Sequence, residues 1–393
     1  MTEDVQKLHD ERVNRFVTTA NLNEPDRVPV VGAAGSGVIY LAGYGFADLL
    51  ENYELEEKLY VAEAAKQNEY VDSFGGSGIN HQMKIATALG SKTFFISPNG
   101  INVQHHETSS MKVEEYDEFI ADPMKFIADK IATRKVTGFQ LESDEEVYAN
   151  LASLFDKAAE IRRGGTANRI IRERFGLPGL TGGGGNPLGG SIAHPCDVFF
   201  DFIRGFKETM TDMRRRPERV DAAIAAISPF YERNIPTQYV GPFPWMNDTH
   251  HIATFLTGPL FERYYWPFYK KSVEGCYNAG IKLISVFEGP WEQHFDLLDE
   301  LPKTSMIAQL EKFEQVVNFK KRYANQFAIY GGMTGMLRLN TFEDSLERVK
   351  KTLDIAAPGG GYIFSPGGIS APGDGTPERQ EQICRWVFEN ANY

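Results

Sequence analysis

The chain has 393 residues, of which 42% are hydrophobic and 24% charged, and its formal net charge is -12. This length and composition allow a large core, and barrel folds with insertions often occupy such a length as one domain. The acidic balance argues against nucleic-acid and membrane partners, because both require a basic surface. The dense basic run Arg214-Arg215-Arg216 is predicted to be the solvated face of a helix.

The start of the chain, MTEDVQKLHDERVNRF, is charged and lacks the apolar segment of a signal peptide. No run approaches the ~18 apolar residues of a membrane span. The cysteines are widely spaced and form no CxxC pair, which is typical of a reducing compartment; they are Cys196, Cys276 and Cys384. We therefore expect a cytoplasmic protein without a cysteine-rich zinc module.

In chain order, a polar helical start leads into a strand over 28–31 and the glycine-rich segment 32–37. The glycine order in that segment is the reverse of the dinucleotide-binding fingerprint, so a dinucleotide site is disfavoured. Residues 47–72 have a helical pattern. Residues 92–108 alternate as a hairpin and carry His105 and His106, of which at most one can face an interior site.

Residues 111–135 and 144–174 are predicted to be helical, the first interrupted at Asp122-Pro123. The Gly182–Gly190 stretch fits either a loop over an active site or a flexible connection. His194-Pro195-Cys196-Asp197 has the H-x-C spacing of a zinc site, but Pro195 favours a helix start, with Asp197 as a candidate N-cap.

Residues 239–251, YVGPFPWMNDTHH, are predicted to form a loop that could line a pocket for a flat ligand. Its candidate site residues are two aromatic side chains and three titratable ones, namely Phe243, Trp245, Asp248, His250 and His251. The alternative for Asp248 is a cap of the following turn. The aromatic helix after it, 261–269, belongs to the core or to a dimer face.

From residue 279 the pattern becomes regular, with a short β-rich run over 281–287 that ends at Glu288-Gly289-Pro290-Trp291. A carboxylate at the tip of a buried strand is costly unless it is paired, metal-bound or at a water-filled opening. Glu288 is therefore the first functional candidate. The alternative is a strand-end glutamate that reaches solvent or caps the next helix.

Strands near 281–287, 306–310, 326–330 and 361–365 alternate with helices 292–300, 312–323, 342–355 and 377–390. Such β-loop-α units predict parallel strands with right-handed crossovers, and a TIM (β/α)8 barrel is their natural closure. We expect one domain over 1–393 with a helical N-terminal extension and insertions, the barrel itself spanning about 27–390. Its loops would place Glu288, the Gly332-Met333 segment and Gly367 around one opening.

Several segments, in this order and spacing, resemble the uroporphyrinogen decarboxylase superfamily from about Arg15 to Val387. They are Glu24-Pro25-Asp26-Arg27-Val28-Pro29-Val30, Glu115-Tyr116-Asp117 with Asp122-Pro123, Asp201-Phe202-Ile203-Arg204-Gly205 with Asp212-Met213, and the run from Gly359 to Gly367 before Thr376-Pro377-Glu378. The resemblance implies a TIM barrel and either decarboxylation or methyl transfer.

The chain departs from the decarboxylases because residues 32–37 replace their arginine-rich segment, which removes the means of holding a substrate with many carboxylates. It departs from the thiol-methylating enzymes because their H-x-C would fall on Val286-Phe287-Glu288, and their later cysteine near Gly367 or Gly368. The remaining resemblance is to the methyl-donor branch, which moves a methyl group from a methoxylated, often aromatic, donor to the Co(I) of a corrinoid protein.

The resemblance therefore implies an O-demethylating methyltransferase whose cobalamin belongs to a partner protein, since no D-x-H-x-x-G motif is present. Glu288 with His250 or His251 could donate a proton to the ether oxygen or, as Glu288 and His251, hold a Zn²⁺. Ring-clamping candidates are Phe243, Trp245 and Trp291, and Met333 is a further substrate-binding candidate. The alternative is a decarboxylase or lyase with His250 or Asp248 as the acid and Arg338 or Arg204 on a carboxylate.

Overall fold

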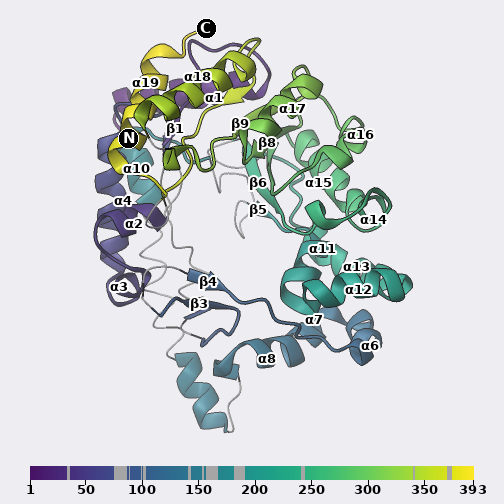
Figure 1. The fold of residues 1–393 in the computed structure, drawn as a ribbon. Helices are drawn as coiled ribbons and strands as arrows, with labels where there is room; N and C mark the ends of the chain where they lie inside the picture. Colours follow the sequence, from purple (N-terminus) through teal and green to yellow (C-terminus); the bar gives the residue numbers. More distant parts are fainter. Residues whose placement is uncertain are drawn as a thin grey trace.

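The computed structural model describes residues 1–32, 36–74, 86–87, 89–98, 100, 103–139, 143–152, 155, 167–180, 191–239, 244–339, 341–369 and 374–393. Along these residues the chain travels once around the molecule, so that the first helices lie next to the last ones (Figure 1). No helix in these ranges is both long and apolar enough to cross a membrane.

A parallel sheet of six strands, in the order β10-β9-β8-β7-β6-β5, is the centre of the fold. Its strands are β5 (Ser191–Ile192), β6 (Trp245–His250), β7 (Lys282–Phe287), β8 (Met306–Leu310), β9 (Ala328–Gly331) and β10 (Tyr362–Ile363). Parallel β1 (Val31–Gly32) and β2 (Ser73–Phe74) continue beyond β10, because a parallel bridge joins Val30 to Phe364. An antiparallel hairpin, β3 (Phe94–Ile96) and β4 (Val103–His105), stands apart from them.

A (β/α)8 barrel requires eight parallel strands in a row. The strands β2, β1, β10, β9, β8, β7, β6 and β5 lie next to one another in this order and are parallel, so they meet this requirement. The closed barrel that the sequence predicts is nevertheless not completed, because no ladder joins β2 to β5 among the described residues. Beside β2 lies an irregular segment instead, in which the Pro178 carbonyl accepts a hydrogen bond from the Phe74 amide.

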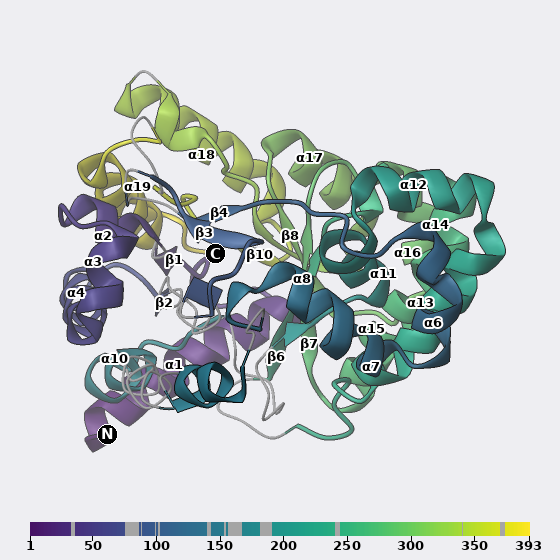
Figure 2. The ribbon, with the colours of Figure 1, turned by 90° about the horizontal axis from the view of Figure 1, so that it is seen from below.

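Helices connect the strands and cover the outer face of the sheet (Figures 1 and 2). In the first half of the chain they are α1 (Glu3–Ala20), α2 (Ser36–Leu41), α3 (Phe46–Glu51), α4 (Tyr53–Gln67), η1 (Val113–Glu115), α6 (Tyr116–Ala121), α7 (Pro123–Phe126), η2 (Ile127–Ala132), α8 (Thr133–Lys135), η3 (Thr137–Phe139) and α10 (Ala167–Phe175). In the second half they are α11 (Pro195–Val198), η4 (Phe199–Arg204), α12 (Phe206–Arg215), α13 (Pro217–Glu232), η5 (Ala253–Phe255), α14 (Gly258–Tyr264), α15 (Trp266–Asn278), η6 (Glu292–His294), α16 (Phe295–Leu298), α17 (Phe313–Tyr323), η7 (Met336–Arg338), α18 (Phe342–Ala356) and α19 (Pro377–Asn390).

The alternation of side chains along the strands produces two cores. One cluster unites Trp245, Ile284, Ile307 and Ala328, which come from neighbouring strands and share the inner face, with Phe16 of α1. The Phe16 ring meets the Trp245 ring edge-on at 6.0 Å, so α1 covers the amino-terminal edge of the sheet (Figure 2). The larger cluster fills the space between the outer face and the helices.

A buried ion cluster joins the first helix to the first strands. Asp72 is fully buried and accepts hydrogen bonds from Arg15, from both terminal nitrogens of Arg27, and from the Val30 amide. Arg15 also holds Asp26, at 2.6 and 2.7 Å. Because Asp26-Arg27 precedes β1 and Asp72 precedes β2, these contacts fix the two strands beside each other.

Three further predictions made from the sequence require correction. Residues 245–250 form the strand β6 and not a loop, because Trp245, Met246, Asp248 and His250 are buried between neighbouring layers. The helix at 195 starts as predicted, but His194 and not Asp197 is its N-cap, since the His194 ring accepts a hydrogen bond from the Cys196 amide. The helix pattern over 47–72 divides at Asn52, which caps α4.

Candidate active site

The register between β6 and β7 brings His251 and Glu288 together. His250 pairs with Phe287 at the end of the ladder, so the next residue of each strand also lies side by side. Side chains alternate along a strand, so both positions share the inner face with Trp245 and Ile284, while His250 and Phe287 face the helices. This edge is the carboxyl end of the parallel strands, where barrel enzymes carry their catalytic residues.

The two side chains form a hydrogen-bonded ion pair. His251 Nδ1 lies 3.0 Å from Glu288 Oε2, and the side chains are 42% and 41% exposed. The hydrogen bond to Glu288 is the largest cause that raises the pKa of His251, to about 9, and the charges of Asp201, Glu288 and Asp197 act in the same direction. His251 is therefore an imidazolium at neutral pH, accessible to solvent and able to give up a proton.

Asp197 fixes the backbone that carries this imidazolium. Its Oδ1 accepts hydrogen bonds from the amides of His251 and Ile252, at 3.2 and 2.7 Å, and its Oδ2 accepts one from the Tyr265 hydroxyl at 2.6 Å. Burial raises the pKa of Asp197 to about 7. Asp201 lies one helical turn further along, and burial raises the pKa of its carboxyl group to about 6, while the His251 charge opposes the shift.

His250 and Asp248 lie behind the pair, on the opposite face of β6. Both are buried, and His250 Nδ1 lies 2.6 Å from the Tyr265 hydroxyl. Because that hydroxyl donates its proton to Asp197, His250 donates from Nδ1 and keeps a lone pair on Nε2. Burial lowers the pKa of His250 well below its ordinary value and raises that of Asp248 well above its own, so it disfavours the charged form of each. Although 3.3 Å separates His250 Nε2 from Asp248 Oδ2, their alignment is not that of a hydrogen bond.

The loop after Glu288 is held in place by Glu311, which follows β8, and by Gln315 of α17. The Gly289 amide donates to Glu311 Oε2 at 2.9 Å, and the Gln315 amide group donates to the Gly289 carbonyl at 2.5 Å. Gly289 has a φ of 69°, and a Cβ at this position would lie 2.5 Å from the Thr254 hydroxyl oxygen. Glycine is therefore required here, and the loop fixes the direction in which Glu288 leaves its strand.

The predicted ring-binding residues are not gathered around the pair. Trp291 is buried and stacks on Phe287 at 3.9 Å, within the aromatic core behind the sheet. Trp245 is buried at the start of β6, the opposite end from His251, and its indole nitrogen donates to the Gly179 carbonyl. Met333 is buried in the loop after β9. Phe243 and the Gly182–Gly190 stretch lie outside the described residues.

The H-x-C segment has no free ligand for a metal. His194 Nδ1 accepts from the Cys196 amide at 3.0 Å, and Nε2 lies 2.9 Å from the Tyr265 carbonyl oxygen. Burial lowers the pKa of His194 to about 3 and raises that of the buried Cys196 thiol. Among the described residues, no group of three or more histidine, cysteine, aspartate and glutamate side chains could hold a metal ion.

Sequence reasoning overlooked Asp201, Lys135 and Tyr265 as possible site residues, and it considered His105 only as one of a pair with His106. His105 lies on β4, where its ring stacks on Phe94 at 4.8 Å and contacts Phe202 at 5.9 Å. The spacing of Asp197 and Asp201, four residues apart at the start of a helix, was an available signal for the acidic side of the site. The other residues reach it only through the tertiary fold.

A family model described as uroporphyrinogen decarboxylase (URO-D) matches residues 169–379. The match covers more than half of the chain, including β5 to β10 and both members of the His251–Glu288 pair. The protein belongs to the uroporphyrinogen decarboxylase family, whose members are enzymes. None of the curated proteins compared with the chain matches it.

Proposed function

We propose that the protein is a methyltransferase that moves a methyl group from a methoxylated, aromatic donor to the Co(I) of a corrinoid partner protein. The observation that carries the proposal is the half-exposed His251 imidazolium, held by Glu288 at the carboxyl edge of the sheet. Cleavage of an aryl methyl ether expels a phenolate, which is a poor leaving group unless its oxygen is protonated.

The proposed step uses His251 as the general acid. The methyl carbon forms a bond to the cobalt of the partner while the carbon–oxygen bond breaks, and its electron pair stays on oxygen. The oxygen takes the proton from His251, which leaves a neutral imidazole and a phenol. Glu288 orients the ring and stabilises the imidazolium, and Asp197 fixes its backbone through the His251 and Ile252 amides.

A zinc ion on Glu288 and His251 was the alternative means of activating the ether. The two side chains bond to each other at 3.0 Å, and the described residues add no third histidine, cysteine or carboxylate to them. Catalytic zinc ordinarily takes three protein ligands. This donor set does not fit zinc, and the proposed step depends on proton donation alone.

The decarboxylase alternative assigned a substrate carboxylate to Arg204 or Arg338. Arg204 is buried and donates to Asp212, which is also bonded by Tyr116, and to the Met111 carbonyl. Arg338 pairs with Asp374. The engagement of both arginines with partners in the chain supports methyl transfer over this form of the alternative.

The test combines the purified protein with a reduced Co(I) corrinoid protein and a panel of methoxylated aromatic compounds and methylamines, followed by cobalt absorbance. We expect conversion to the methylated corrinoid protein with aryl methyl ethers, and its abolition by Glu288→Gln. We expect full activity for Glu292→Gln, whose exposed side chain accepts a hydrogen bond from Asn318 of α17. Retained activity in Glu288→Gln would refute the assignment of Glu288. If no donor is converted, release of carbon dioxide from carboxylated substrates becomes the assay.

A further inference from the structure

The ammonium group of Lys135 is buried without a hydrogen-bonding partner. Lys135 ends α8 and is 8% exposed. Among the described residues, its Nζ has neither a hydrogen bond nor an ion pair. Burial lowers its pKa to about 8, so the group still carries most of its charge at neutral pH. The Asp201 charge opposes this shift, but a buried ammonium without a hydrogen-bond acceptor still costs stability.

Two other partly buried lysines provide a comparison within the same chain. Lys282 donates to the Thr304 carbonyl at 2.7 Å. Lys320 donates to the Ala356 and Gly360 carbonyls, at 2.8 and 2.9 Å. Burial lowers the pKa of both, as it does for Lys135. The fold thus supplies acceptors to these two buried ammonium groups but not to Lys135.

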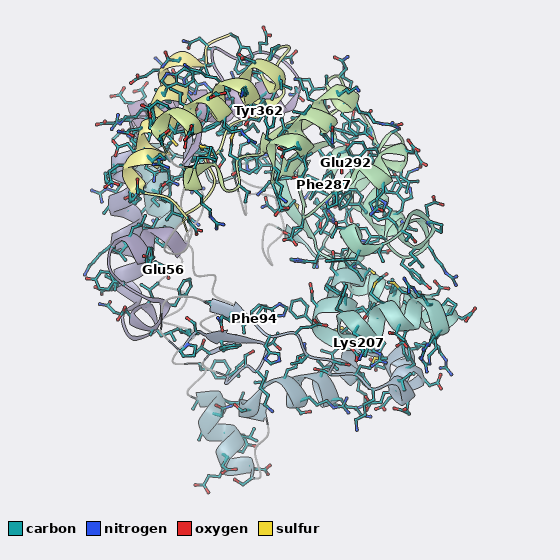
Figure 3. The ribbon with its side chains drawn as sticks, in the orientation of Figure 1. Glu56, Phe94, Lys207, Phe287, Glu292 and Tyr362 are labelled. Atoms are coloured by element: carbon teal, nitrogen blue, oxygen red, sulfur yellow. The ribbon has the colours of Figure 1, made fainter. Side chains whose placement is uncertain are left out.

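One aromatic ring contacts the Lys135 ammonium, and two more rings pack against that one. Its Nζ lies 5.4 Å from the centroid of the Phe202 ring, within the range of a cation–π contact. Phe202 in turn contacts Phe94 and His105, whose rings stack on each other at 4.8 Å. We call Phe94, His105 and Phe202 the aromatic shelf. Figure 3 labels Phe94, which lies on the β3–β4 hairpin, far from Tyr362 of β10.

The shelf and the His251–Glu288 pair belong to one region. Asp201 is the residue before Phe202. Its pKa is shifted by the charges of four neighbouring groups, His251, Glu288, Glu107 and Lys135. The pKa of His105 is lowered chiefly by burial, and the charges of Lys135 and His251 lower it further, so the ring is neutral at neutral pH. The Lys135 ammonium and the His251 imidazolium are therefore two cationic groups that both lie within electrostatic range of Asp201.

We propose that Lys135 and the aromatic shelf form a subsite for the carboxylate and ring of an aromatic acid. The carboxylate of the ligand accepts the hydrogen bond for which Lys135 Nζ has no partner in the described part of the chain. The aromatic ring of the ligand packs on the aromatic shelf. The subsite stands on its own as a binding site. Its consequence for the reaction rests on the function proposed above: the methyl donor carries a carboxylate in addition to its methoxyl group.

The test measures binding by isothermal titration calorimetry, with 4-methoxybenzoate and its neutral analogue methoxybenzene as probes. We expect Lys135→Met to weaken the binding of 4-methoxybenzoate at least tenfold, with little effect on methoxybenzene, and Lys135→Arg to retain most of the affinity. Lys282→Met is the matched control and should bind both probes as the wild type does. Removal of the uncompensated ammonium should leave the melting temperature of the ligand-free Lys135→Met protein unchanged or higher.

Equal affinity of the wild type and Lys135→Met for 4-methoxybenzoate would overturn the subsite, as would equal affinity of the wild type for both probes or binding of neither. The assay needs no corrinoid protein, so it fails or succeeds independently of methyl transfer. If 4-methoxybenzoate binds in a Lys135-dependent way but neither it nor any other carboxylated aryl methyl ether of the panel gives methylated corrinoid protein, the subsite stands and the proposed methyltransferase function is refuted.

Discussion

Replacement of Glu288 by glutamine should shift the titration of His251. The hydrogen bond from Glu288 is the largest cause of the raised pKa of His251, about 9 compared with an ordinary value of 6.5. A neighbouring opposite charge typically accounts for ~1–3 pH units, and solvent reduces the effect for side chains that are 42% and 41% exposed. We expect the midpoint to fall by about one to two pH units, because Asp201 and Asp197 remain.

The shift can be measured by NMR titration of the His251 ring in the wild type, Glu288→Gln and the control Glu292→Gln. The folded-state pKa lies above 6.5, so protonation of His251 adds stability that is complete below about pH 6.5 and is lost as the pH rises through about 9. Thermal unfolding over this window should show a smaller decline for Glu288→Gln. A midpoint near 9 that survives the substitution would refute the reasoning, as would a wild-type midpoint near 6.5.

Three other substitutions test the buried contacts and charges that stabilise the fold and the site. Asp72→Asn should lower the free energy of unfolding by about 3–5 kcal/mol in denaturant titrations, because it leaves the buried end of Arg27 without its counter-charge and Arg15 with Asp26 alone. A loss similar to that of Asp221→Asn would contradict this. Tyr265→Phe should cost about 1–3 kcal/mol in the same assay, since it removes the buried partner of His250 Nδ1 and the partner of Asp197 Oδ2. Asp201→Asn should raise the melting temperature at pH 8 but not at pH 4: the folded-state pKa of this carboxyl, about 6, exceeds its ordinary 3.8, so its ionisation costs stability as the pH rises through that window. Equal effects of Asp201→Asn at both pH values would refute this last expectation.

The second half of the fold could be read from the sequence with unusual accuracy. The strand predicted at 306–310 and the helix predicted at 377–390 coincide with β8 and α19. Each is a short apolar run or a periodic segment bounded by glycine, proline or a capping threonine, so local patterns decide them. The 245–250 segment could not be read in this way, because its polar and aromatic residues resemble a loop until β5 and β7 pair with its two edges.

The sequence by itself determined that Glu288 ends a buried strand, that the second half alternates strands and helices, and that the chain resembles its family. It left His250 and His251 equivalent, because adjacent residues have no local signal that separates them. The tertiary structure separated them through the register of β6 on β7, which turns His251 toward Glu288 and His250 into the core. It also placed Lys135, Phe94 and Phe202 together and left the Lys135 ammonium without an acceptor, since burial and pairing depend on contacts between segments far apart in the chain.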